Sequence, residues 1–132
     1  MDVAIELRLL VWAAALGLVH LLWGSAAAQP QRGGMDWNVG PRDEPRPLTG
    51  VAARLQRAFA NYRETFPIFA VAVLACAVAE KFSDLSALGA LLYVGGRVLY
   101  LPLYAMGTPW LRSLVWIAAT AGIVLVIIAF LA

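Results

Sequence analysis

The segment Arg57–Ala79, "RAFANYRETFPIFAVAVLACAVA", joins a strongly polar stretch to an uncharged one. Its first eight residues hold two arginines, an asparagine and a glutamate, whereas the fifteen residues from Thr65 to Ala79 carry no charge. A long uncharged run is typical of a helix that enters a hydrocarbon layer. The polar residues directly before this uncharged run therefore need an explanation.

The composition places the whole chain in a membrane. Apolar residues make up 62% of the 132 residues and charged residues only 14%, against about a quarter in ordinary soluble domains. Leu9–Ala28 and Ser113–Ala132 are each twenty residues long and almost free of polar groups, which matches the roughly 20 residues that a helix needs to cross the bilayer core. Thr65–Ala79 and Leu85–Met106 are two further apolar runs.

The sequence thus predicts an all-α integral membrane protein, a four-transmembrane-helix bundle that forms one domain over residues 1–132. The expected helices cover about 3–28, 51–80, 84–106 and 109–131, and a cytoplasmic loop covers about 29–50. Three prolines in "GPRDEPRPLTG" exclude a helix from the second half of that loop.

The arginines predict the orientation. The loop 29–50, the start of the second helix and the turn before the fourth carry most of them, and the opposite side has only Arg8 and Lys81. Positive residues favour the cytoplasm, so we expect both termini outside, in a bacterial inner membrane. Since these arginines already have an orienting role and alternate with acids, we expect no nucleic-acid partner.

Three other features predict no separate chemistry. Cys76 is the one cysteine and lies in an apolar run, where it packs as a small hydrophobe. His20 lies in the first apolar run, and we expect an interhelical hydrogen bond there. One His, one Cys and scattered acids predict no metal site.

"SAAAQ" at Ser25–Gln29 resembles a signal cleavage site, but the apolar run before it is long for a signal peptide and the residues ahead of that run are acidic.

Two polar stripes cross the second and third predicted helices. At 100° per residue, Arg54, Arg57, Asn61 and Glu64 lie within an arc of about 80°. On the third helix Tyr93, Arg97, Tyr100 and Tyr104 lie within about 60°. Arg97 is inside an apolar run, where an unpaired charge costs several kcal/mol, so we expect Glu64 as its partner.

Two interpretations of the stripes remain open. In the structural one, Arg97 and Glu64 form a buried ion pair that fixes the bundle, and the tyrosines form an aromatic belt. In the functional one, the excess of cationic donors over acids marks a site for an anionic ligand, because arginine forks suit carboxylates. A small transporter is less favoured, since the polar groups cluster near one face of the membrane.

At these residues the chain resembles a known family. "RLQRAFANYRETFPIF" is similar to the second-helix signature R-A-x-x-N-x-x-E-x-x-P of the membrane-associated proteins in eicosanoid and glutathione metabolism (MAPEG). "GRVLYLPLY" is similar to the third-helix signature R-x-x-Y-x-x-x-Y of the same family. The family includes microsomal glutathione transferases.

The resemblance implies a homotrimer that binds glutathione between subunits near the cytoplasmic face. The residues that it implies for glutathione binding are Arg57, Asn61, Glu64, Arg97, Tyr100 and Tyr104. It implies Arg112 as the catalytic residue that activates the thiol, with a lipophilic electrophile as the second substrate. The family also has a member that binds lipid without transferase activity, so a lipid-binding or scaffold function remains the alternative.

Overall fold

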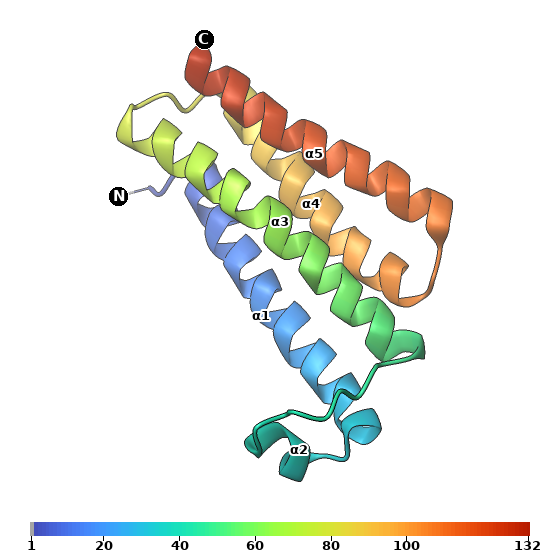
Figure 1. Ribbon diagram of the computed structural model, residues 1–132. Helices are drawn as coiled ribbons and strands as arrows, with labels where there is room; N and C mark the ends of the chain where they lie inside the picture. The colour runs from blue at the N-terminus through green and yellow to red at the C-terminus, as the bar shows by residue number, and fades with distance from the viewer. Residues whose placement is uncertain (1) are drawn as a thin grey trace.

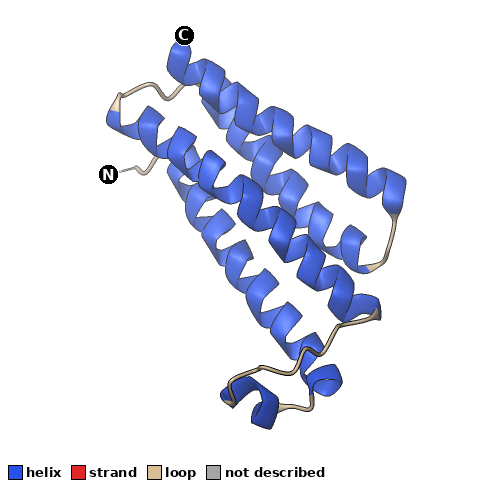
Figure 2. Ribbon diagram, in the orientation of Figure 1, coloured by secondary structure: helices blue, strands red, loops and turns tan. Residues whose placement is uncertain are grey.

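The computed structural model describes residues 2–132, and over that range the chain is helical with no strand (Figures 1 and 2). Four long helices lie side by side, and a short helix lies in the linker between the first two of them (Figure 1). The helices are α1 (Ile5–Arg32), α2 (Met35–Val39), α3 (Gly50–Val78), α4 (Asp84–Ala105) and α5 (Pro109–Leu131).

Three of the helices in the described range, α1, α4 and α5, are long and apolar enough to cross a membrane. The fourth long helix, α3, is not among them, because its first half contains the polar stretch around Arg57 and Glu64. Length and composition therefore support three of the four membrane spans predicted from the sequence.

The first helix is longer than predicted. It continues past Ala28 through Pro30 to Arg32. Pro30 has no N–H and so removes one i→i−4 hydrogen bond, but only two further helical residues follow it. The stop comes at Gly33, whose φ of 81° is the left-handed conformation that favours glycine.

The predicted loop is only partly extended. Its first part forms the last turn of α1 and the five-residue α2. Residues 40–49 are non-helical, as the prolines predict. Gln31 ties the two ends of the linker together, since its amide donates to the carbonyl of Thr49 at 3.0 Å and its oxygen accepts from the Thr49 amide at 2.8 Å.

The tightest contact in the bundle joins α4 and α5. A Cβ on Gly89 would lie 2.5 Å from the carbonyl oxygen of Gly122, and one on Gly122 would lie 2.4 Å from that of Gly89. The absence of side chains therefore lets the two backbones touch, as small residues do between membrane helices. This contact fixes the pair of helices that carries most of the predicted site.

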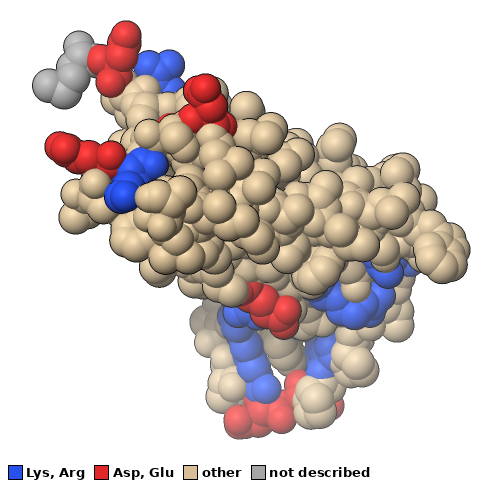
Figure 3. All heavy atoms as spheres, turned by 90° about the horizontal axis from the view of Figure 1, so that it is seen from above, with Lys and Arg blue, Asp and Glu red and all other residues tan. Residues whose placement is uncertain are grey.

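The charged residues lie mainly near the two ends of the bundle (Figure 3). Both termini lie at one end of the bundle, and the α1–α3 linker and the α4–α5 turn lie at the other (Figure 1). In Figure 3 the charged atoms gather near these ends, with a broad uncharged surface between them. That surface has the character expected for contact with a bilayer.

Candidate functional site

The polar stripe of α3 faces the last turns of α4. Arg54 Nε donates to the carbonyl oxygen of Ala105 at 2.8 Å, and Arg57 Nε donates to the hydroxyl of Tyr104 at 3.3 Å. Ala105 is the last residue of α4, so Arg54 satisfies one of the carbonyl groups that a helix leaves unpaired at its end. Arg54 thus has a structural contact, whereas Arg57 contacts a residue of the predicted site.

Asn61 is the residue at which the two predicted stripes meet. Its Oδ1 accepts a hydrogen bond from Arg97 Nη1 at 2.7 Å and another from Trp116 Nε1 at 3.2 Å. The prediction that Arg97 pairs with Glu64 is wrong, because over residues 2–132 the structure has no ion pair between them. Glu64 lies nearly a turn beyond Asn61 on α3 and is exposed, so the register of α3 on α4 places the asparagine beside the arginine.

These two hydrogen bonds orient the Asn61 amide. Arg97 and the Trp116 indole are donors only, so the atom that faces both of them must be the amide oxygen. An amide oxygen has two acceptor positions, and both are used. The two N–H donors of Asn61 are therefore turned away from this contact and remain free for another partner.

Arg97 lies beneath this site and not at its surface. Its side chain is fully buried, and its guanidinium carbon lies 4.1 Å from the ring centre of Tyr100 and 5.2 Å from that of Tyr62. Aromatic faces attract a cation, most strongly where water is excluded. The rings and the hydrogen bond to Asn61 thus take the place of the predicted carboxylate partner, and Nε and Nη2 of Arg97 have no hydrogen-bond partner among residues 2–132.

A pocket of about 330 Å³ opens beside Asn61, between α3, α4 and α5. Its volume lies at the lower end of the roughly 300–1,000 Å³ typical of small-molecule sites. The residues that line it are Asn61, Tyr100, Tyr104, Arg112, Ser113, Trp116 and Ile117.

Two arginines approach the same tyrosine in this pocket. The guanidinium carbon of Arg112 lies 4.4 Å from the centre of the Tyr104 ring, and that of Arg57 lies 5.9 Å from it. Tyr100 packs edge-on against Tyr104, with the ring centres 5.5 Å apart. The lining of the pocket therefore includes one cation, Arg112, and the rings of Tyr100 and Tyr104, and a second cation, Arg57, lies against Tyr104.

The structure brings together most of the residues predicted for the site. Four of them line the pocket directly: Asn61, Tyr100, Tyr104 and Arg112. Arg57 borders it through Tyr104, and Arg97 lies behind Asn61. Glu64 is exposed and does not line it.

Sequence reasoning missed Trp116. It belongs to an apolar helix, where tryptophan reads as a membrane-interface residue. Its position four residues after Arg112 was a usable signal, because residues i and i+4 share a helix face. Ser113 and Ile117, which also line the pocket, were missed because they belong to the same apolar helix.

The polar groups of the pocket are mostly hydrogen-bond donors. The Asn61 amide, the Arg112 guanidinium and the tyrosine hydroxyl groups can all donate to an oxygen or a thiolate. The Ser113 hydroxyl already donates to the carbonyl oxygen of Pro109 at 3.0 Å. Of the described residues that line the pocket, none is acidic. The chemistry suits an anionic ligand.

The fold and this pocket together define an all-helical integral membrane protein with a donor-rich pocket between its last three long helices. The model of the MAPEG family matches residues 9–132. The chain belongs to the MAPEG family. No curated protein and no solved structure matched the chain.

Proposed function

We propose that the protein is a glutathione-dependent transferase or peroxidase that acts on lipophilic electrophiles in the bilayer. Membership of the MAPEG family supports a function in glutathione or eicosanoid metabolism. The observation that carries the finer proposal is the position of Asn61: its oxygen accepts from Arg97 and Trp116, which leaves its N–H donors for another partner, and it lines a pocket with Tyr104 and Arg112.

Glutathione has two carboxylates, an ammonium group and a thiol, and the polar groups around the pocket match these charges. Arg57 and the Asn61 amide are donors for carboxylates. Glu64, exposed beside them on α3, is the candidate for the ammonium group. Arg112 lines the pocket near Tyr104, where its charge would favour the thiolate over the thiol.

Stabilising the thiolate is a small part of the expected rate. Lowering a thiol pKa from about 8.5 to about 6.5 raises the thiolate fraction at pH 7 roughly 25-fold. The same change lowers the nucleophilicity of the thiolate roughly tenfold, for a Brønsted slope of 0.4–0.5. Concentrating an apolar electrophile beside a held thiolate is the larger contribution, which accounts for a site within a membrane protein.

We infer that the site is completed by a neighbouring copy in a homotrimer, with all four long helices crossing the membrane. Ser113 lines the pocket and is exposed, as are Arg57 and Glu64 on α3. Such polar residues at the bundle surface are costly against lipid and suit a subunit boundary. The arginine distribution favours the linker in the cytoplasm and both termini outside, in a bacterial inner membrane.

A non-catalytic lipid-binding or scaffold function is the second candidate. It is favoured by the half-buried position of Arg112 against the Tyr104 ring, because a guanidinium held by an aromatic face need not contact a thiol. In that case the pocket would hold an anionic head group without chemistry.

Two measurements on the detergent-solubilised protein separate these functions. Calorimetric titration with glutathione tests the site, and a spectrophotometric assay with 1-chloro-2,4-dinitrobenzene tests the chemistry. The proposal expects binding and turnover. Binding without turnover would favour the second candidate, and no binding would overturn the assignment of the pocket.

A further inference from the structure

The orientation of the Asn61 amide depends on two donors, because one donor is not enough to fix it. The terminal torsion of an asparagine side chain is broad, so a single hydrogen bond to the oxygen leaves the amide plane free to rock. Donors to a carbonyl oxygen lie near the plane of the carbonyl group and its substituents. Two donors on the two lone pairs therefore fix this plane, and with it the direction of both N–H bonds.

Arg97 and Trp116 are these two donors, and they are held in different ways. Arg97 Nη1 donates at 2.7 Å, and its guanidinium carbon lies 4.1 and 5.2 Å from the ring centres of Tyr100 and Tyr62. Trp116 Nε1 donates at 3.2 Å from α5, where the ring is half-buried against the core. Arg97 therefore fixes the position of the Asn61 oxygen, and the Trp116 contact fixes the plane of the amide.

A close approach of α4 and α5 lies directly beside the two donors. A Cβ on Gly96 would lie 2.9 Å from the Cβ of Ala119 and 3.3 Å from the carbonyl oxygen of Val115. Gly96 precedes Arg97 on α4, and Val115 precedes Trp116 on α5. The absence of a side chain at Gly96 thus lets the two backbones approach closely at the level of both donors.

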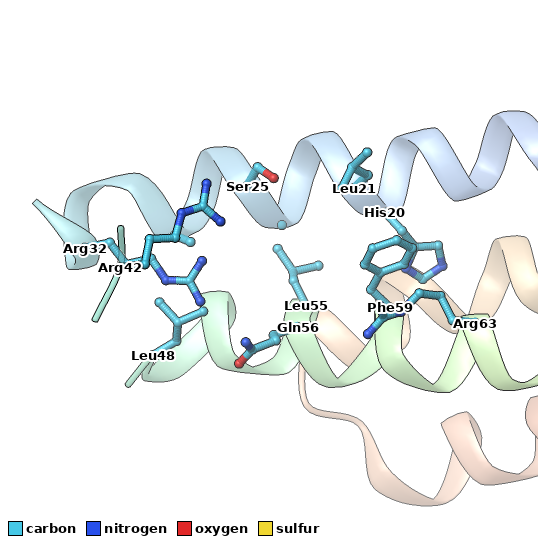
Figure 4. Close-up of a pocket in the computed structure, with 12 residues that line it drawn as sticks. His20, Leu21, Ser25, Arg32, Arg42, Leu48, Leu55, Gln56, Phe59 and Arg63 are labelled. Carbon is cyan, nitrogen blue, oxygen red and sulfur yellow. The ribbon is translucent and has the colours of Figure 1, made fainter. Parts of the chain in front are cut away.

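The face of α3 toward α1 carries the other side-chain amide of this helix and shows a different arrangement. Gln56 lines a separate pocket between α3, α1 and the linker (Figure 4). His20 lines the same pocket and stacks on Tyr62 and Phe59, and neither of its ring nitrogens has a hydrogen-bond partner among residues 2–132. The interhelical hydrogen bond predicted for His20 is therefore not formed. The buried polar ring on this face is held by stacking, whereas Asn61 is held by hydrogen bonds.

We propose that Trp116 is a positioning residue of the pocket, which acts on a bound ligand through Asn61. This inference rests on the proposed function, because it takes the Asn61 amide as a donor to a carboxylate of glutathione. With the amide plane fixed, the free N–H bonds are aligned before the ligand arrives. Without the indole donor the amide is ordered only on binding, which costs affinity. Since the contact is the same in the ground state and the transition state, the effect should appear in KM and not in kcat.

The test compares Trp116→Phe with the wild type in detergent, by calorimetric titration with glutathione and by turnover of 1-chloro-2,4-dinitrobenzene. Phenylalanine keeps an aromatic ring against the core and removes the N–H donor. We expect the Kd and the KM for glutathione to rise about three- to tenfold, while kcat changes less than about twofold. Trp110→Phe is the matched control and should change neither, because Trp110 is 83% exposed on α5 and does not line the pocket.

A structural role of Trp116 and a direct contact with the ligand give other results. A partly unfolded variant would show a lower binding stoichiometry with an unchanged Kd, and that outcome would overturn the proposal. Direct contact would persist without the Asn61 donors, so Trp116→Phe is repeated in Asn61→Asp and kcat/KM is taken from the initial slope. If Trp116 acts through Asn61, kcat/KM falls there by less than about twofold more. A further loss as large as that in the wild-type background would contradict the proposal.

Gly96→Ala tests the same arrangement without changing a residue that lines the pocket. The new Cβ would press on Ala119 and shift Trp116 relative to α4, so the KM for glutathione should rise in the folded protein. Gly95→Ala is the control, because nothing lies within 4 Å of its new Cβ. If the wild type does not bind glutathione, the proposed function itself fails. If the wild type binds and Trp116→Phe binds equally well, the positioning role alone is wrong.

Discussion

The arginines on the two faces of α3 have different partners. On the face toward α4 and α5, the buried arginine is held by Asn61 and by aromatic rings. On the face toward α1, Arg32, Arg42 and Arg63 line a groove without acids among its described residues, and His20 has no partner. On the first face an α3 side chain pairs with side chains of α4 and α5, although Arg97 Nε and Nη2 have no hydrogen-bond partner among residues 2–132. On the second face neither nitrogen of His20 has a partner in that range, and Arg42 donates to the backbone carbonyl of Asn38.

Hydrogen bonding separates the polar atoms of α3 that stabilise the bundle from those available to a ligand. A polar atom whose partners are all inside the chain stabilises the bundle. A polar atom turned away from those partners, such as the Asn61 amide nitrogen, is available for binding. The same side chain can have both roles, and substitutions can separate them.

The largest effect on stability is expected from Asn61→Leu. This change leaves Arg97 Nη1 and Trp116 Nε1 without an acceptor, at a cost of roughly 2–4 kcal/mol. Thermal unfolding in detergent should show a clearly lower midpoint. Gln56→Leu is the control, because Gln56 is an exposed amide on the opposite side of the same helix. Equal midpoints for the two variants would show that the Asn61 contacts do not hold the face together.

The next largest effect is on binding. Arg57 is exposed and its side chain donates a hydrogen bond to the Tyr104 hydroxyl, so Arg57→Ala should leave the fold intact. Glutathione affinity should fall by roughly 1.5–3 kcal/mol, about 10- to 150-fold, as for a lost hydrogen bond to a charged group. Arg63→Ala removes a charge from the other face and should bind glutathione as the wild type does. If both variants bind equally, the functional interpretation of the stripe fails.

A third prediction concerns the helix pair that supports the site. Gly89→Ala would force apart the α4 and α5 backbones, because the new Cβ would lie 2.5 Å from the Gly122 oxygen. We expect a loss of about 1–3 kcal/mol, typical of overpacking. Gly95→Ala, with nothing within 4 Å, should be neutral or slightly stabilising. Chemical unfolding of both variants measures the difference, and a loss at Gly95 of the same size would contradict it.

The smallest effect is expected at Glu64. Because Glu64 is exposed and not paired with Arg97, Glu64→Gln should change stability by less than about 0.5 kcal/mol. A buried ion pair broken on one side would cost about 3–5 kcal/mol. A drop of that size in the unfolding free energy would support the ion pair between Glu64 and Arg97 that the sequence predicted.

Sequence periodicity predicted which residues approach one another, but not which atoms pair. The stripes on α3 and α4 placed Asn61, Tyr104 and Arg97 on facing surfaces because helix geometry fixes their directions. The partner of Arg97 depended on the axial register of the two helices, which the sequence does not encode locally. Charge complementarity therefore favoured Glu64, whereas the structure places Asn61 there.

Two other features required the structure for different reasons. Trp116 lies in the apolar helix α5, a sequence context typical of a lipid-facing residue. Its indole therefore could not be assigned to the site from the sequence. The end of α1 was predicted too early because the apolar run ends at Ala28, whereas the helix continues to Arg32 and is capped by Gly33.

The most direct test of the account is the glutathione affinity of Asn61→Asp, measured by calorimetry beside the wild type. Aspartate keeps an acceptor for Arg97 and Trp116, and its charge strengthens the contact with Arg97, so the unfolding midpoint should be equal or higher. It also replaces the amide donors in the pocket by an anionic oxygen that repels a carboxylate or thiolate. The account predicts a stable protein whose glutathione affinity has fallen at least about 100-fold. A stable variant that binds glutathione as tightly as the wild type would contradict it.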